Sequence, residues 1–149
     1  MREKLTRNQR IAKVLEYLSE NRLMTLGTCL ENKPWGATVF YAYDKKLNLL
    51  FYSRLDTKHC QHIAKNPNVS VVINHNWKYL DGKIRGLQIV GKVKKVSKKD
   101  YPILFDIFRK RFKWADKFIK DHILYLIKPS EIWYLDEKLF GHFYRVKIT

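Results

Sequence analysis

Seven consecutive positions between a predicted strand and a predicted helix hold five side chains that can bind an anion. They are two hydroxyls, two fixed cations and one imidazole: Ser53, Arg54, Thr57, Lys58 and His59. Residues 47–52 (LNLLFY) have the apolar character and length of a strand, and Asp56 or Thr57 can cap a helix directly after it. A helix N-terminus presents free N–H groups and a positive dipole end. The pattern indicates a phosphate-binding corner; the alternative is a solvated basic turn.

Length and composition indicate one folded domain, residues 1–149, with 46% hydrophobic and 14% aromatic residues. No apolar run approaches the length of a membrane span and the N-terminus is charged, so we expect no signal peptide, no anchor and a cytoplasmic location. Cys29 and Cys60 form no CxxC motif, which fits a reduced protein. His59 and His62 lack a nearby Cys or Glu to complete a metal shell, so no metal site is predicted.

The net charge of +16 is unevenly distributed. Between Lys92 and Lys120 there are eleven Lys or Arg residues against three Asp residues. Such a basic face attracts nucleic acid, anionic lipid or phosphorylated small molecules, or serves solubility alone.

Hydrophobic periodicity and turn residues divide the chain into strands and a few helices. Helices are predicted over residues 6–20, with Thr6 and Gln9 as a capping box, over 57–65, after a second box at Ser97 and Asp100, and over 115–120. The apolar side of the third helix is predicted to carry Ile103, Leu104, Ile107 and Phe108. Predicted strands cover residues 23–30, 35–43, 47–52, 69–74, 84–96, 123–127, 131–135 and an edge strand in 140–148.

Three details of this assignment shape the expected sheet. Short turns at 31–34 and 44–46 predict that the first three strands form an antiparallel meander, while 75–83 is predicted as a loop. Gly86 and Gly91 suggest bulges or a bend, and Pro129 is expected to separate two strands. Because strands dominate without regular β-α-β alternation, we expect a mainly β (α+β) fold, a small bent antiparallel barrel of six to seven strands with peripheral helices.

An ordered set of short motifs supports a family comparison. The pieces are Tyr52-Ser53, then DTKH at 56–59, NPNV at 66–69 and GLQIVGKV at 86–93. From the first helix to the fifth strand, this order resembles the FMN-binding split barrels related to pyridoxamine 5′-phosphate oxidase, and it is most similar to a small bacterial branch of that superfamily. The resemblance implies a split β-barrel and a homodimer that holds two FMN molecules in clefts between the protomers.

The resemblance also implies roles for individual residues. Tyr52 and Ser53 fall where the family contacts the flavin phosphate and ribityl chain, and Thr57, Lys58 and His59 fall on the Ser-Arg-Lys triplet of the oxidase. The strand 35–41, with Trp35, Thr38 and Tyr41, falls where the family faces the flavin ring. Arg54 adds a cation at the corner, and Gln88 can hydrogen-bond the flavin. No residue is singled out as a catalytic acid or base.

Several of these residues also fit an ordinary structural role. Gln88 also fits an exposed polar position on an alternating strand, and Trp35 and Tyr41 fit a core or a dimer interface. Trp133 and His142 can reach the partner's cofactor or can simply pack at the surface. The oxidase's strand Arg and Lys correspond to Gly36 and Tyr41 here, and its pyridoxal-phosphate-binding residues have no evident counterparts. Oxidation of pyridoxamine phosphate is therefore not predicted.

The preferred hypothesis is an FMN-binding protein that acts as a flavin-dependent oxidoreductase. The alternatives are a split-barrel module that binds another planar anion, such as haem or a deazaflavin, and a nucleic-acid binder that uses the basic stretch Lys92 to Lys120. Lys58 is expected to contribute more to FMN affinity than Arg54. Because an imidazole loses its charge near pH 6.5, His59 is expected to make that affinity fall as the pH rises from about 6 to 8.

Overall fold

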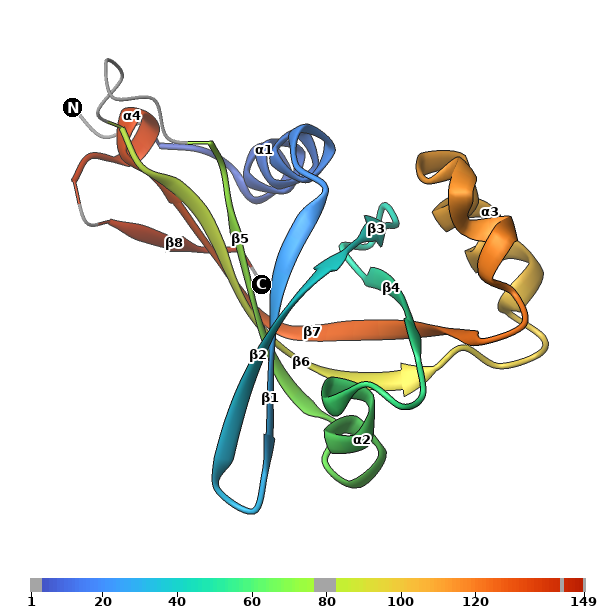
Figure 1. Ribbon diagram of the computed structural model, residues 1–149. Helices are drawn as coiled ribbons and strands as arrows, with labels where there is room; N and C mark the ends of the chain where they lie inside the picture. The colour runs from blue at the N-terminus through green and yellow to red at the C-terminus, as the bar shows by residue number, and fades with distance from the viewer. Residues whose placement is uncertain (1–3, 77–82, 143, 149) are drawn as a thin grey trace.

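One curled antiparallel sheet forms the centre of the molecule (Figure 1). The computed structural model describes residues 4–76, 83–142 and 144–148. Seven strands run in the order β2-β1-β5-β6-β7-β4-β3, and β8 pairs with β7. The strands are β1 Leu23–Leu30, β2 Lys33–Phe40, β3 Ala42–Tyr43, β4 Leu49–Arg54, β5 Asn68–Asn74, β6 Arg85–Lys95, β7 His122–Asp136 and β8 Arg145–Lys147. The predicted fold class, a mainly β split barrel with peripheral helices, is confirmed.

The helices lie outside the sheet. They are α1 Arg7–Glu20, α2 Lys58–Lys65, α3 Tyr101–Arg111, α4 Glu137–Phe140 and the 3₁₀ helix η1 Lys113–Phe118. Helix α2 packs against the β1–β2 hairpin, whereas α3 stands beside β3 and β4 (Figure 1). The helix that was expected over 115–120 is η1, which starts two residues earlier.

Local capping signals in the first half of the chain are confirmed. Thr6 and Gln9 form the reciprocal capping box at the start of α1, with backbone-to-side-chain bonds of 2.8 and 3.2 Å. Of the two candidates at α2, Thr57 is the N-cap and accepts from the backbone N–H of Cys60. The box at Ser97 and Asp100 forms only in part, because these residues bond each other in a turn and the Asp100 side chain makes no cap bond to α3.

The β1–β2 hairpin turns over two residues, Glu31 and Asn32, which both have positive φ. Pro34, which was expected in the turn, lies in β2 opposite Cys29. The expected continuous second strand is wrong, because β2 ends at Phe40 and only the two-residue β3 pairs with β4. The meander is therefore incomplete, and the main neighbour of β4 is β7.

A bulge explains why Pro129 does not divide β7. The predicted pair of strands is one strand of 15 residues. Its register with β6 shifts between Val90 and Gly91, where Gly91 faces Pro129. A Cβ on Gly91 would lie 2.6 Å from the carbonyl oxygen of Lys128, so only glycine permits this approach. The expected bulge is confirmed next to Gly91, with the extra residue, Ser130, in β7, whereas Gly86 keeps regular register on both sides.

Strand β4 is buried on both faces and joins two cores. Leu49 and Phe51 belong to the larger core inside the curled sheet, whereas Leu50 and Tyr52 belong to a smaller core under α3. The apolar side predicted for α3 was partly wrong: Phe105 and Phe108 are its buried residues, and Ile103 is 71% exposed. This double burial fixes the end of β4, where the predicted phosphate corner begins.

The C-terminal tail forms less strand than expected. Phe140 ends α4, and of the tail residues that the structure describes only Arg145–Lys147 pair with the edge of β7. Of the loop expected over 75–83, residues 77–82 lie outside the described residues. Among the described helices, none has the length and apolar character needed to cross a membrane.

Candidate functional site

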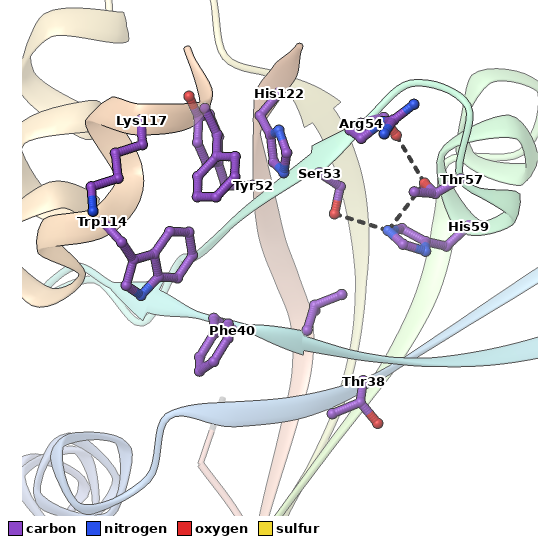
Figure 2. Close-up of a pocket in the computed structure, with 12 residues that line it drawn as sticks. Thr38, Phe40, Tyr52, Ser53, Arg54, Thr57, His59, Trp114, Lys117 and His122 are labelled. Atoms are coloured by element: carbon purple, nitrogen blue, oxygen red, sulfur yellow. Dashed lines mark hydrogen bonds between the residues drawn. The ribbon is translucent and has the colours of Figure 1, made fainter. Parts of the chain in front are cut away.

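A cavity of about 600 Å³ opens at the corner between β4 and α2 (Figure 2). We call it the corner cavity. It is lined by Thr38, Val39, Phe40, Tyr52, Ser53, Arg54, Thr57, His59, Trp114, Lys117, Phe118 and His122. These residues come from β2, β4, the start of α2, η1 and the first residue of β7. The volume is typical of a site for a small molecule or cofactor.

One wall of the corner cavity is a polar network around His59. The Nε2 atom of His59 lies 2.9 Å from Ser53 Oγ and 3.3 Å from Thr57 Oγ1 (Figure 2). The Thr57 hydroxyl donates to the carbonyl oxygen of Arg54 at 2.9 Å. Ser53 and His59 are both buried, with exposed fractions of 6% and 8%. Burial lowers the pKa of His59, so the imidazole is neutral at neutral pH.

Counting protons in this network assigns the tautomer of His59. The single hydroxyl proton of Thr57 is used on Arg54, so Thr57 can only accept from His59. Nε2 must then carry the proton and donate to both hydroxyl oxygens. Ser53 accepts this bond, and its own hydroxyl proton remains to donate to a ligand in the corner cavity.

The two predicted cations of the corner point in different directions. Arg54 lines the corner cavity, but its guanidinium donates to both carboxylate oxygens of Asp56, at 3.1 and 2.7 Å. Lys58 is outside the corner cavity, with its ammonium 4.3 Å from the centre of the Trp35 ring. Lys117 of η1 lines the opposite end (Figure 2). Charge around the corner cavity is therefore partly neutralised on the Arg54 side.

The second wall is aromatic. Trp114 lies 5.3 Å from the Phe40 ring and 5.9 Å from the Phe118 ring, measured between ring centres. Phe118 and Tyr52 each lie 5.0 Å from the ring of His122. Flat apolar side chains of this kind can receive a planar ring. The corner cavity thus combines a hydrogen-bonding end with an aromatic end.

Six of the ten site residues predicted from sequence meet in the corner cavity: Thr38, Tyr52, Ser53, Arg54, Thr57 and His59. The other four do not. Lys58 and Trp35 contact each other beside the hairpin. Tyr41 is fully buried, and its hydroxyl donates to the carbonyl oxygen of Leu18 at 2.8 Å. Gln88 is exposed on the outer face of the sheet, between Val72 and Trp133 in the neighbouring strands.

Sequence reasoning missed half of the lining. The missed residues are Val39, Phe40, Trp114, Lys117, Phe118 and His122. Trp114 and Phe118 are four apart, a helical spacing that also fits ordinary core packing. His122 stands at the start of a strand with no motif around it. Across residues 4–76, 83–142 and 144–148, no three His, Cys, Asp or Glu side chains gather closely enough to hold a metal ion.

Comparison with known families gives one match over most of the chain. Residues 11–136 match the family described as pyridoxamine 5′-phosphate oxidase. A UPF0306 protein of Klebsiella pneumoniae is 28% identical over 131 residues, which cover 87% of this chain and 86% of that protein. A UPF0306 protein of Campylobacter jejuni is 29% identical over 115 residues, which cover 76% of this chain and 82% of that protein.

Solved structures show the same fold at low identity. A haem-binding protein from Mycobacterium smegmatis superposes with a TM-score of 0.79 at 13% identity, covering 97% of this chain but only 58% of that one. HutZ, the haem storage protein from Vibrio cholerae, has a TM-score of 0.72 at 16% identity and covers 95% and 98%. An FAD-binding protein from Mesorhizobium loti has a TM-score of 0.70 at 16% identity and covers 84% and 91%.

Proposed function

The chain belongs to the pyridoxamine 5′-phosphate oxidase family, and from that premise we propose that it binds FMN in the corner cavity and acts as a flavin-dependent oxidoreductase. The observation that carries the proposal is the pairing of a hydrogen-bonding end with an aromatic end in one cavity of about 600 Å³. A phosphorylated, planar cofactor needs both. The family match and the ordered sequence motifs support the same choice of cofactor.

The residues of the corner cavity fit this group. The Ser53 hydroxyl donor, the Arg54 guanidinium and the first turn of α2 suit a phosphate, because charge-assisted bonds and helix N–H groups favour a dianion. Phe40, Trp114 and Phe118 suit the ring. When bound, FMN supplies hydride or electron transfer. The protein's part is to anchor the phosphate, exclude water from the aromatic end and orient the ring.

We further propose that two copies of the chain associate through the outer face of the sheet. Val72 and Val90 are exposed there on β5 and β6, with exposed fractions of 37% and 47%. Gln88 stands in the same face beside Trp133 of β7. A second copy would bury these side chains and bring Gln88 and Trp133 toward its own cofactor. Light scattering at micromolar concentration tests this: a mass near 18.0 kDa, that of one chain, rules the dimer out.

The test of cofactor binding is a titration of the purified protein with FMN, followed by flavin absorption and fluorescence. Saturable quenching with one FMN per chain supports the proposal. The test variant is Trp114→Ala. It removes part of the aromatic end and should weaken binding while leaving the His59 network in place. A wild-type protein that leaves flavin fluorescence unchanged rules out FMN as the cofactor.

A haem or a deazaflavin is the second candidate, and one observation favours the haem. Two imidazoles, His59 and His122, line the corner cavity, and an imidazole is a common axial ligand of haem iron. Solved proteins of the same fold include haem binders. Titration with haem separates the candidates, because a coordinated haem gives an intense Soret band. A Soret shift lost in His122→Gln or His59→Gln would favour this alternative over FMN.

A further inference from the structure

His122 is the second imidazole of the corner cavity, and no sequence motif pointed to it. Its Nδ1 atom lies 2.6 Å from Oδ1 of Asp121, and its side chain is 19% exposed. The ring contacts the rings of Tyr52 and Phe118, each with its centre 5.0 Å away. Figure 2 shows it between Tyr52 and Ser53, pointing into the corner cavity. A carboxylate and two aromatic rings therefore orient the imidazole before any ligand arrives.

The carboxylate of Asp121 assigns the nitrogens of His122. An ionised carboxylate can only accept, so Nδ1 carries a proton in both the neutral and the charged imidazole. Nε2 is then the nitrogen that gains or loses a proton. Among the described residues, none forms a hydrogen bond with Nε2 of His122. His59 differs, because its Nε2 already donates within the network of Ser53 and Thr57.

The neighbours of His122 favour an anion. Arg54 is its cross-strand partner in the β4–β7 pairing, and Lys117 lines the same cavity. Other charged or titratable groups also lie around the ring. Asp56 binds Arg54, Asp116 and Asp121 lie near Tyr52, and His59 lies across the corner cavity. Tyr52 stays neutral, because burial raises its pKa to about 12.

We infer that His122, oriented by Asp121, binds the phosphate monoester of the cavity's ligand through Nε2 and takes up a proton when it does so. The inference rests on the proposed function, since FMN is the phosphate monoester proposed for this site. It assigns to β7 a phosphate contact opposite the β4–α2 corner. It also moves the expected pH dependence of binding from His59 to His122.

The direction of the pH effect follows from linkage. A bound dianion favours the imidazolium form of His122, so binding is coupled to proton uptake and affinity falls as the pH rises. The second pKa of a phosphate, about 6, acts in the opposite direction below that pH. The measurement therefore belongs above pH 6.

The first experiment uses the free protein. Long-range ¹⁵N–¹H NMR spectra report the tautomer of each histidine, and we expect Nδ1–H for His122 and Nε2–H for His59. Asp121→Asn should weaken the preference of His122 for the Nδ1–H tautomer. Asp116→Asn, the same charge change within η1, should leave that preference unchanged. An Nε2–H tautomer for His122 in the wild type overturns the inference.

The second experiment compares ligands and variants. FMN and riboflavin, which lacks the phosphate, are titrated between pH 6.5 and 8 into wild type, His122→Gln and His59→Gln. We expect FMN affinity to fall with pH in wild type and His59→Gln and to be flat in His122→Gln, which should bind roughly tenfold more weakly at pH 6.5. Riboflavin affinity should be flat throughout. A slope that survives in His122→Gln, or one shared by riboflavin, overturns the inference.

Asp121→Asn adds a test of sign in the same titration. Simple electrostatics predicts tighter FMN binding when a negative charge is removed, whereas an orienting role for Asp121 predicts weaker binding. Tighter binding therefore contradicts the inference. If the wild type binds no FMN, the proposed function fails, and inorganic phosphate becomes the probe. A phosphate-induced rise in the pKa of His122, read from its NMR shift, then still supports the phosphate contact, and no change excludes it.

Discussion

The corner cavity has two walls that arise in different ways. The polar wall comes from one short stretch, Ser53 to His59, in which a strand end, an N-cap and a helix start follow one another. The aromatic wall joins Phe40 of β2 to Trp114 and Phe118 of η1, which are far apart in the chain. The polar wall depends on hydrogen bonds formed within a few residues, whereas the aromatic wall exists only once the smaller core has packed.

The same contrast separates the two imidazoles. His59 belongs to the polar wall, where burial lowers its pKa and its Nε2 is already engaged. His122 reaches the corner cavity because β7 pairs with β4, and its orientation comes from Asp121 and two aromatic rings. His59 therefore lies in a recognisable sequence motif, but its Nε2 is already hydrogen-bonded. His122 lies in no motif, but its Nε2 is available to a ligand. Disrupting each wall separately tests this division.

The largest expected effect comes from removing the support of the aromatic wall. Phe108 is fully buried and contacts Tyr52, Phe112 and Trp114. Phe108→Ala should lower the free energy of unfolding by about 3–5 kcal/mol, because it leaves a cavity in the smaller core. Urea unfolding measures this. Ile103→Ala on the same helix, at a position 71% exposed, should stay within about 0.5 kcal/mol of wild type.

Breaking the polar wall should cost less. Ser53→Ala removes the nearer acceptor of the buried His59 Nε2–H, which leaves only the longer contact to Thr57. The free energy of unfolding should fall by about 1–3 kcal/mol, the usual range for a buried donor that loses its partner. Ser130→Ala, where an exposed hydroxyl donates to Val90, is the matched control and should have little effect. Equal stability of both variants would contradict the assigned network.

The two cations of the corner provide a sharper comparison. From their positions we expect Arg54→Gln to weaken FMN binding roughly tenfold, and Lys58→Gln to change it by less than about threefold. This order is the reverse of the sequence-based expectation, because Lys58 stacks on Trp35 outside the corner cavity. Asp56→Asn should tighten binding by freeing the guanidinium. A larger loss for Lys58→Gln would instead favour a phosphate position beside Trp35.

The smallest expected effect is the pH dependence of stability. The pKa of His59 is lowered in the folded protein by burial, so below its ordinary value near 6.5 the unfolded chain binds more protons than the folded one. The stability of the wild type should therefore fall as the pH drops through about 6.5 toward the lower folded pKa. His59→Gln should lose less stability over the same range in thermal or urea unfolding. Parallel pH profiles would show that His59 stays accessible to water.

Much of the fold was predictable because its signals are local. The capping box at Thr6, the N-cap at Thr57 and the bulge at Gly91 each depend on the backbone geometry of a few residues. The failures have a common cause. The predicted break at Pro129 did not occur, because a bulge in β7 next to Pro129, opposite Val90 and Gly91 of β6, accommodates a residue without an N–H. The strand-breaking propensity of a proline takes no account of how its strand pairs with a neighbour.

The sequence by itself determined the mainly β class with peripheral helices and the polar wall, since strand periodicity, a capping hydroxyl and the 53–59 run are local signals. Only the tertiary structure decided which cations face the corner cavity, that Tyr41 is buried in the core, and that Trp114, Phe118 and His122 complete the site. The physical reason is that side-chain direction beyond one turn depends on packing. Strand pairing between β4 and β7 brings His122 beside Arg54, and no local pattern specifies that pairing.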